Sequence, residues 1–360
     1  MLNKGTGMRK IKARLKPLRI IHSYAPLRIN DIGGWTDTWF SKQGKVLNLA
    51  VLPPVEVQIR VFPNEKKEED RVLVHAENYG ETFRVHPERP SFLCHPLLQF
   101  TIASLVIPKD FWLEISLFSP VPAGISAGTS ASVCVALLGA LAFLSGKKFS
   151  SHEIASLAHR VETEKLKQQS GIQDQICAAY GGVCFIDMYR YPFSRVLKLK
   201  LQPRIWEELN RRICFVYLGK PHLSSVIHEK VIALLEKGGE QLRHIERMKK
   251  LAEKAKEFLV RGDLGSYGRI MVINNECQKA LYAKLISEEA DSVMAVARKY
   301  RASGWKVNGA GGKGGSMTIL ANSDDGLRRK MIEEINSLGR GIKSLPVSLS
   351  SSGLRVWESE

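Results

Sequence analysis

Between residues 119 and 132 the chain reads Ser119-Pro120-Val121-Pro122-Ala123-Gly124-Ile125-Ser126-Ala127-Gly128-Thr129-Ser130-Ala131-Ser132. These small hydroxyl and glycine residues lead directly into an apolar run, which predicts a helix over 130–145. Glycines let backbone N–H groups point at an anion, hydroxyls add donors and a metal ligand, and the first helical turn supplies the positive end of its dipole. The stretch therefore predicts a phosphate cradle. Its alternative interpretation is a glycine-rich turn with Ser and Thr helix caps.

Length and composition bound the class of protein. A chain of 360 residues is long for a single core, and a hydrophobic content of 44% is enough to fill two lobes. The 53 basic and 36 acidic residues give a net charge of +17, which favours anionic partners. The basic residues are spread out without interleaved aromatic residues, so we do not expect nucleic-acid binding.

Targeting and redox signals favour a cytoplasmic protein. The longest apolar run, 133–144, is too short to cross a bilayer, so we expect no membrane span. The basic N-terminal tail, 1–17, lacks the apolar core and cleavage site of a secretory signal. The six cysteines show no C-x-x-C pair and the nine histidines show no metal-ligand spacing. We therefore expect reduced thiols and no zinc site.

The first half of the chain reads as strands followed by helices. The clearest predicted strands are 19–24, 46–51, 55–61 and 111–117, with a charged loop at 64–71. After the glycine-rich stretch and its helix, Ser150 and Glu153 form the capping box of a second helix. A strand returns at 182–187. This order predicts an α+β lobe.

The second half is predicted to form a separate lobe. Pro192 and Pro203 break regular structure, so we place the lobe boundary within 190–211. Beyond it the pattern predicts a strand, charged amphipathic helices, a further helix, and a strand, glycine loop and strand, at 213–218, 225–283, 287–303 and 305–321. The predicted domains are 18–200 and 201–360.

A second glycine-rich segment, Gly309-Ala310-Gly311-Gly312-Lys313-Gly314, matches the G-x-G-x-x-G pattern of dinucleotide sites. Residues 316–320 read as a strand, however, and not as the helix whose N-terminus would hold a pyrophosphate. A glycine turn between two strands that closes over a neighbouring site fits better. A plain flexible hairpin is the alternative, and we expect Lys313 to be a solvated charge.

A guanidinium and a carboxylate flank a double-glycine turn in the segment 25–38. Arg28 is suited to hold phosphate oxygens or to favour ionisation of a hydroxyl, and Asp37 is suited to accept hydrogen bonds from a polyol. Gly34 and Thr36 of the same turn join the candidate substrate site. The alternative is a surface salt bridge between Arg28 and Asp37.

Two further carboxylates follow the predicted second helix. Glu162 lies at the margin of that helix's apolar face, so it can point inward as a hard oxygen ligand for Mg²⁺; a solvated side chain, as expected for Glu164, is the alternative. Asp174 opens a short helix after a glycine turn, where it is either a cap or the carboxylate that receives a proton from an attacking hydroxyl, kept ionised by Arg28. Phosphoryl transfer needs mainly such positioning and electrostatic stabilisation.

With these motifs, the chain resembles the GHMP kinase superfamily over roughly residues 18–320. It looks most like the branch of fucokinases and D-glycero-D-manno-heptose 7-phosphate kinases, on the basis of Arg28-Ile29, Gly33-Gly34-Trp35-Thr36-Asp37, His95-Pro96-Leu97-Leu98 and Gln173-Asp174-Gln175. The resemblance implies a two-lobed fold, with an N-terminal lobe like ribosomal protein S5, a ferredoxin-like C-terminal lobe and the active site between them. It also implies ATP-dependent phosphorylation of a sugar hydroxyl with Mg²⁺.

The resemblance also implies roles by position. Asp174 matches the catalytic carboxylate, Arg28 the active-site arginine, Asp37 the sugar-binding aspartate and Glu162 a Mg²⁺ ligand. The implied ATP-binding residues are Pro122, Gly124, Ser126, Ala127, Gly128, Thr129 and Ser130. The implied substrate contacts beyond Arg28, Asp37 and Asp174 are Gly34, Thr36, Gly311 and Gly312, the last two in the third glycine loop, residues 309–315.

The sequence departs from the family pattern in three places. Ala131 stands where a serine often binds Mg²⁺, so Ser130 or Ser132 takes that role, or Glu162 holds the ion with waters. Ser316 stands where an aromatic residue is common, beside Lys313. Trp39-Phe40 replaces the prolines often seen after Thr-Asp-Thr, which leaves the exact sugar open.

The sequence thus predicts an ATP-dependent kinase that phosphorylates a fucose-type or heptose-type sugar or sugar phosphate, with the anomeric C1 hydroxyl as the expected acceptor. One alternative is another small-molecule kinase of the superfamily. The other is a non-catalytic sugar or nucleotide sensor on the same fold, against which the presence of Asp174, Arg28 and Glu162 argues. A homodimer is compatible with the sequence.

Overall fold

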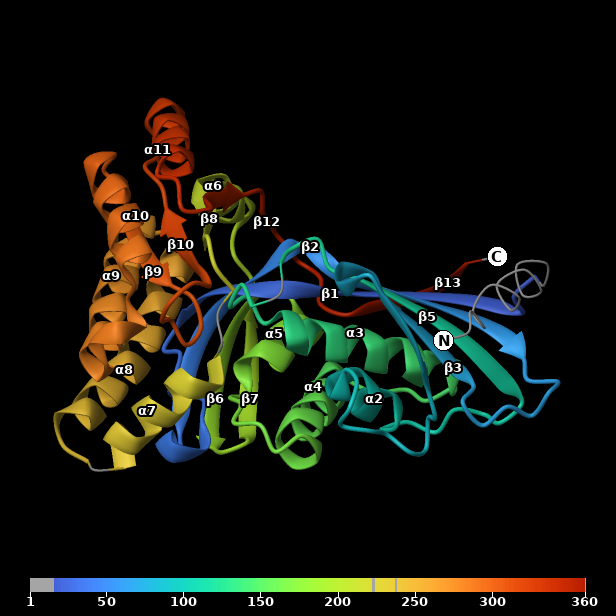
Figure 1. Cartoon of the computed structure of the whole chain (residues 1–360). Coiled ribbons are helices and arrows are strands. Elements are labelled where there is room, and N and C mark those ends of the chain that lie inside the picture. The colour runs from blue at the N-terminus through green and yellow to red at the C-terminus, as the bar shows by residue number, and fades with distance from the viewer. Residues whose placement is uncertain (1–15, 123, 222–223, 237, 360) are drawn as a thin grey trace.

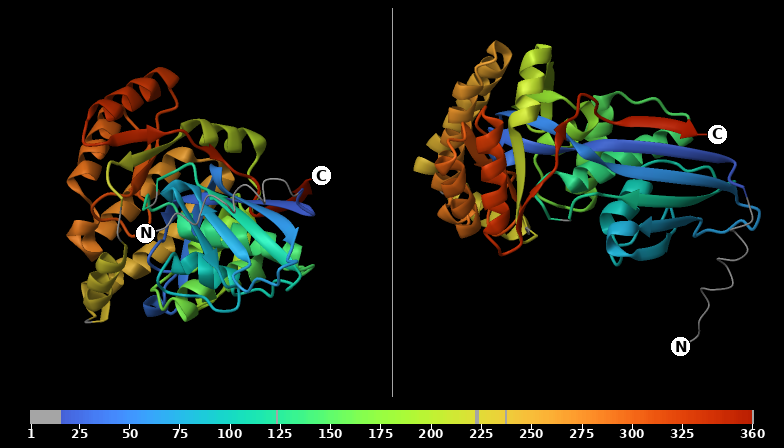
Figure 2. Two further views of the ribbon diagram at one scale, coloured as in Figure 1. Left: turned by 45° about the vertical axis from the view of Figure 1, so that its right-hand side comes forward. Right: turned by 90° about the horizontal axis from the view of Figure 1, so that it is seen from above.

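The computed structural model describes residues 16–122, 124–221, 224–236 and 238–359, so the predicted basic tail lies almost wholly outside the described residues. A large twisted sheet with helices on one face adjoins a smaller sheet with its own helices (Figures 1 and 2). The predicted α+β class is confirmed. The likeness of the two parts to ribosomal protein S5 and to a ferredoxin-like lobe stays a prediction.

The first sheet has nine strands within the described ranges, in the order β13-β1-β2-β5-β3-β4, with β6 and β12 also paired to β2 and β7 paired to β6. Only β3 and β5 are parallel. The strands are β1 Arg19–Ile32, β2 Gly44–Pro63, β3 Val72–Ala76, β4 Glu81–Val85, β5 Phe111–Phe118, β6 Val183–Arg190, β7 Phe193–Leu199, β12 Ser348–Leu349 and β13 Arg355–Ser359. The predicted charged loop at 64–71 joins β2 to β3.

Four helices cover one face of this sheet: α2 Pro96–Ile102, α3 Thr129–Leu144, α4 Ser151–Arg160 and α5 Gln173–Tyr180 (Figure 1). The central helix α3 packs against β1 and β2 on one side and against α2, α4 and α5 on the others. It is apolar all round because every side of it is covered. The predicted capping box of Ser150 and Glu153 is present at the start of α4.

The second sheet is antiparallel, in the order β11-β8-β10-β9. Its strands are β8 Ile213–Leu218, β9 Gly304–Val307, β10 Ser316–Leu320 and β11 Ile342–Leu345. Its helices are α6 Pro203–Arg212, α7 Ser224–Glu236, α8 Glu240–Arg261, α9 Leu264–Leu281, α10 Glu288–Lys299 and α11 Asp325–Ser337. Buried residues of α8 and α9 share a core with β1 and β2, whereas α10 and α11 pack on the other face of the second sheet. The third glycine loop joins β9 to β10, as predicted.

The two prolines of the predicted lobe boundary lie where one element ends and the next begins. Pro192 is in the turn between β6 and β7, and Pro203 occupies the first turn of α6, where a missing N–H costs nothing. The strands β12 and β13 also return to the first sheet, so residues 348–359 do not belong to the second sheet. The division into domains at residue 200 stays a prediction.

Among the described residues, every helix is too short or too polar to span a membrane. The six cysteines are free thiols, and five of them are buried.

Candidate active site

A cavity of about 560 Å³ lies between the first sheet's helices and the third glycine loop. Its lining includes Arg28, Asp37, Glu162 and Asp174, together with residues 124–130 and Gly309. Segments that are far apart in the sequence, and that each permitted a purely structural interpretation, therefore meet at one cavity.

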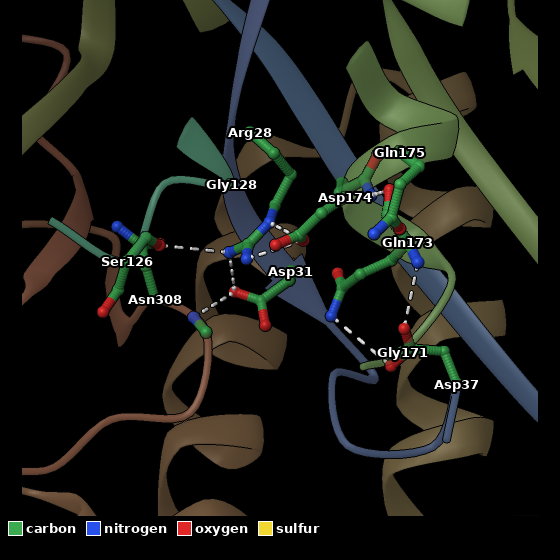
Figure 3. A network of polar contacts seen from close by, with 12 residues as sticks. Arg28, Asp31, Asp37, Ser126, Gly128, Gly171, Gln173, Asp174, Gln175 and Asn308 are labelled. Atoms are coloured by element: carbon green, nitrogen blue, oxygen red, sulfur yellow. Dashed lines mark hydrogen bonds and ion pairs between the residues drawn. The ribbon is translucent and has the colours of Figure 1, made fainter. Parts of the chain in front are cut away.

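Arg28 and Asp174 are in direct contact at the centre of this cavity (Figure 3). The Arg28 guanidinium donates from Nε and Nη2 to Asp174 Oδ1, each at 2.8 Å. Arg28 is buried on β1, whereas the Asp174 side chain keeps 28% exposure at the first turn of α5. The carboxylate is therefore oriented by a buried cation but still open to a ligand.

Gly128 brings the glycine-rich loop against this pair. It has a φ of +66° and is the N-cap of α3, with no side-chain cap among the described residues. A Cβ at Gly128 would lie 3.2 Å from the Asp174 carboxylate, so a residue other than glycine would crowd it. Bare N–H groups at the start of a sixteen-residue helix favour an anion next to Asp174.

Two hydroxyls of the same loop have no hydrogen-bond partner in the described part of the chain. These are Ser126 Oγ and Thr129 Oγ1, which are buried in residues that line the cavity. Buried polar groups are normally paired, and an unpaired one marks a place where a ligand supplies the partner. The loop therefore fits the predicted phosphate cradle.

Glu162 lies in a short π-helical segment, Val161–Lys165, that continues α4. Glu162 is 5% exposed, and its Oε2 accepts hydrogen bonds from Ser170 Oγ at 2.8 Å and Gln175 Nε2 at 2.6 Å. Burial raises the pKa of Glu162 to about 7, against the opposing effect of Ser170 and Ser130. A carboxyl that points inward beside Ser130 fits a hard cation, which would favour its ionised form. Glu164 is exposed, as expected.

Asp37 is buried, and α5 holds its carboxylate. Gln173 N donates to Asp37 Oδ2 at 3.0 Å, and Gln173 Nε2 lies 3.4 Å from Oδ1. Burial raises the pKa of Asp37 to about 7. Arg28 does not contact Asp37, so the alternative of a surface salt bridge between them is wrong: Arg28 is paired with Asp174 and Asp31.

Several predicted site residues do not face the cavity. Thr36 is fully buried, and its hydroxyl donates to the carbonyls of Gly33 and Lys45. Gly34 lies so close to Asp31 that a Cβ at this position would be 2.3 Å from Asp31 Oδ2. Gly312 N donates to Leu285 O at 2.7 Å. The cavity lining does not include five of the predicted site residues, whose roles stay predictions: Gly34, Thr36, Pro122, Gly311 and Gly312.

The cavity lining also includes residues to which the sequence motifs assign no role. Asp31 lies beside Arg28, with Nη1 of the guanidinium 3.2 Å from its Oδ1. The lining also includes the apolar side chains of Leu97, Leu117 and Val133 and that of Asn78, which bonds to the backbone of Ser119. Leu117 lies in β5, Leu97 in α2 and Val133 in α3, and a local pattern gives no sign that three such elements share a cavity.

The chain is similar to known kinases in sequence and in fold. The family described as "GHMP kinases N terminal domain" matches residues 100–182. A mevalonate kinase of Pyrococcus horikoshii is 32% identical over 260 residues, which cover 69% of this chain and 70% of that protein. A D-glycero-alpha-D-manno-heptose 7-phosphate kinase of Campylobacter jejuni is 27% identical over 308 residues, which cover 82% and 88%.

A bifunctional fucokinase/GDP-fucose pyrophosphorylase of Arabidopsis thaliana is 26% identical over 329 residues. The match covers 86% of this chain but only 31% of the plant protein. Among solved structures, a Lactococcus lactis galactokinase superposes with a TM-score of 0.77 at 17% identity, covering 97% of this chain and 98% of that one.

The fold and the site define a phosphotransferase of the small-molecule kinase class. The chain belongs to the GHMP kinase family, as its identity to a mevalonate kinase over more than two thirds of that protein shows.

Proposed function

We propose that the protein is an ATP-dependent sugar kinase that phosphorylates a hydroxyl of a fucose-type or heptose-type sugar or sugar phosphate, with the anomeric C1 hydroxyl as acceptor. The single observation that carries the phosphotransfer is the Arg28–Asp174 pair against Gly128, where the glycine-rich loop begins α3. The relatives named for fucose and heptose 7-phosphate support the acceptor class.

Asp174 is the group that receives the acceptor proton. The acceptor oxygen forms a bond to the γ-phosphorus while the bond from that phosphorus to the bridging oxygen of ADP breaks, and the hydroxyl proton passes to Asp174. Arg28 holds the carboxylate with two donors and places a positive charge beside the transferred group. The Asp37 carboxylate, which already accepts from the backbone N–H and the side-chain amide of Gln173, also accepts a hydrogen bond from a hydroxyl of the same sugar.

The loop 124–130 holds the nucleotide phosphates through backbone N–H groups and the hydroxyls of Ser126 and Thr129. Glu162 and Ser130 are the residues placed to hold Mg²⁺, which when bound neutralises charge on the β- and γ-phosphates. We assign that role to Ser130 and not to Ser132, because Ser132 is buried outside the cavity lining, where its hydroxyl donates to Pro26 O at 2.7 Å and lies 3.1 Å from Gly128 O.

A second candidate acceptor is a non-sugar alcohol such as mevalonate. The observation that favours it is the 32% identity to a mevalonate kinase. The two acceptors differ in the number of hydroxyls that Asp37 and its neighbours would have to satisfy.

The test is ADP release from ATP and Mg²⁺ across free hexoses, fucose, heptoses, their phosphates, mevalonate and homoserine. We expect turnover with a sugar, and loss of about 10²–10⁴-fold in kcat in Asp174→Asn, which keeps the shape of the side chain but cannot accept the proton. Turnover of mevalonate alone would select the second candidate. A silent panel, or an Asp174→Asn variant that turns over like the wild type, would refute the proposal. NMR of the product identifies the phosphorylated carbon.

A further inference from the structure

Asp31 and Lys306 form a buried ion pair next to Arg28. Asp31 lies near the end of β1 and Lys306 lies in β9, so they come from different sheets. Each side chain is 1% exposed, and Lys306 Nζ lies 3.1 Å from Asp31 Oδ1. Replacing such a buried ion pair with apolar residues is often neutral or stabilising, so stability alone gives no reason for its presence.

One oxygen of Asp31 gathers three donors. Asp31 Oδ1 accepts from Lys306 Nζ, from Arg28 Nη1 at 3.2 Å and from the backbone N–H of Gly309 at 3.0 Å. The opposite edge of the Arg28 guanidinium, Nε and Nη2, is the edge that holds Asp174 (Figure 3). The guanidinium is therefore fixed from both sides, by Asp31 behind it and by Asp174 in front.

Asp31 Oδ1 also binds the first residue of the third glycine loop. Gly309 begins this loop and lines the cavity, and its carbonyl accepts from Gln278 Nε2 at 3.0 Å. The preceding residue, Asn308, accepts the backbone N–H of Asn30 at 2.9 Å. Asp31 thus joins β1, which carries Arg28, to the loop between β9 and β10.

Lys306 balances the charge of this cluster. Without Lys306, Arg28 would face two carboxylates, Asp31 and Asp174, and the cluster would be negative where an anionic nucleotide must approach. Burial alone would raise the pKa of Asp31, but Lys306 and Arg28 outweigh that effect and lower it. Asp31 therefore stays ionised and remains a strong acceptor.

We propose that Asp31 and Lys306 are positioning residues for phosphoryl transfer: the Asp31 oxygen aims Arg28 at Asp174 and fixes the third glycine loop over the cavity, while Lys306 keeps the cluster neutral. This inference rests on the proposed kinase function. Misplacing a reacting group by about 1 Å costs about 100-fold in rate, so a loosened Arg28 lowers kcat while nucleotide binding survives.

Two double variants with the same net charge test whether the oxygen of residue 31 positions Arg28 and Gly309. Asp31→Asn/Lys306→Met and Asp31→Leu/Lys306→Met both remove both charges, but only the first keeps an oxygen facing Arg28 and Gly309. We expect both to fold, because neither buries an unpaired charge, and the leucine version to be the less stable, because the Gly309 N–H loses its acceptor. We expect kcat to be about 100-fold below the wild type in the leucine version and to fall much less in the asparagine version, with the KM for ATP unchanged in both.

Equal kcat values in the two double variants, with both folded, would overturn the inference, as would a leucine version whose loss appears only in KM. If the leucine version does not fold, Asp31→Ala/Lys306→Met replaces it in the same comparison. Arg212→Met is the matched control: Arg212 is another buried cation beside the second sheet, bonded to Ala321 O and Ser303 Oγ, and its loss should lower the unfolding temperature but not kcat.

The wild type serves as the reference for the proposed function itself. A wild type that turns over no acceptor refutes the kinase proposal. A wild type that turns over a sugar, with both double variants equal to each other, refutes only the role of Asp31 and Lys306.

Discussion

The Asp37 carboxylate accepts the backbone N–H of Gln173, the residue immediately before Asp174, at 3.0 Å. Asp37 follows β1 and Gln173 begins α5, so this bond joins two parts of the proposed acceptor site that are 136 residues apart. Burial nevertheless raises the pKa of Asp37 to about 7, since the donors of Gln173 do not replace the water that an exposed carboxylate would bind.

Asp37→Asn should flatten the dependence of stability on pH. The Asp37 carboxyl has a pKa near 3.8 when unperturbed and about 7 in the fold, so its proton stabilises the folded protein below about pH 4 and that contribution is lost as the pH rises through 7. Asparagine cannot ionise. The variant should match the wild type near pH 4 and become more stable than it as the pH rises, by up to about 4 kcal/mol at pH 8.

Thermal unfolding at pH 5, 6, 7 and 8 checks this prediction. Asp291→Asn, at an exposed carboxylate of α10, is the control and should leave the profile unchanged. Parallel profiles for the wild type and Asp37→Asn would contradict a buried carboxyl with a raised pKa.

Glu162→Gln should raise the Mg²⁺ concentration needed for half-maximal rate by at least about tenfold. Because the pKa of Glu162 is raised to about 7, protons compete with the cation, so the wild type should need less Mg²⁺ at pH 8 than at pH 6. The glutamine variant should lose this pH dependence. Glu164→Gln, at an exposed residue in the same π-helical segment, should behave as the wild type, and an equal effect at both positions would count against Glu162 as the ligand.

Gly128→Ala and Gly80→Ala make a matched pair. Their φ values are +66° and +62°, so both alanine variants carry a similar left-handed strain of about 1 kcal/mol. A Cβ at Gly80 has no atom within 4 Å, whereas at Gly128 it meets the Asp174 carboxylate. Both should lose similar stability, and only Gly128→Ala should lose kcat. Similar rates in the two variants would show that Gly128 does not limit the placement of Asp174.

Ser130→Ala and Ser132→Ala should have opposite signatures. Ser130 is exposed at the start of α3, and its hydrogen bond lowers the pKa of Glu162. The loss of Ser130 should therefore raise the Mg²⁺ requirement with little effect on stability. Ser132 is 1% exposed and donates to Pro26 O, so its loss should cost about 1 kcal/mol and leave the Mg²⁺ requirement unchanged. Mg²⁺ titrations and urea unfolding of both variants decide which serine serves the metal.

Local patterns in the sequence predicted the parts of the fold that local chemistry controls. The capping box of Ser150, the helix after the glycine-rich stretch and the strand-loop-strand around residues 309–315 are all present. The proximity of Arg28 to Asp174 was also foreseen, because a carboxylate that takes a proton needs a cation nearby.

The features that escaped prediction depend on contacts between distant segments. Lys306 looks like a solvated charge in a strand, and only its pairing with Asp31 across two sheets explains its burial. The position of Thr36 in the double-glycine turn predicts a substrate contact, but its buried hydroxyl bonds to two carbonyls. The strands β12 and β13 are short, and their partners lie about 300 residues earlier in the chain, beyond the reach of any local pattern.

The return of the chain end to the first sheet has a consequence for biosynthesis. Gly182 N bonds to Ser350 O and Leu354 N to Ala179 O, so the segment before β13 packs on the end of α5, the helix whose first turn carries Asp174. Until residues 350–359 have left the ribosome, β1 lacks its β13 neighbour and α5 lacks this support. The nascent chain therefore carries every candidate active-site residue well before it can hold them in place, and kinase activity should appear only after residues 350–359 have left the exit tunnel.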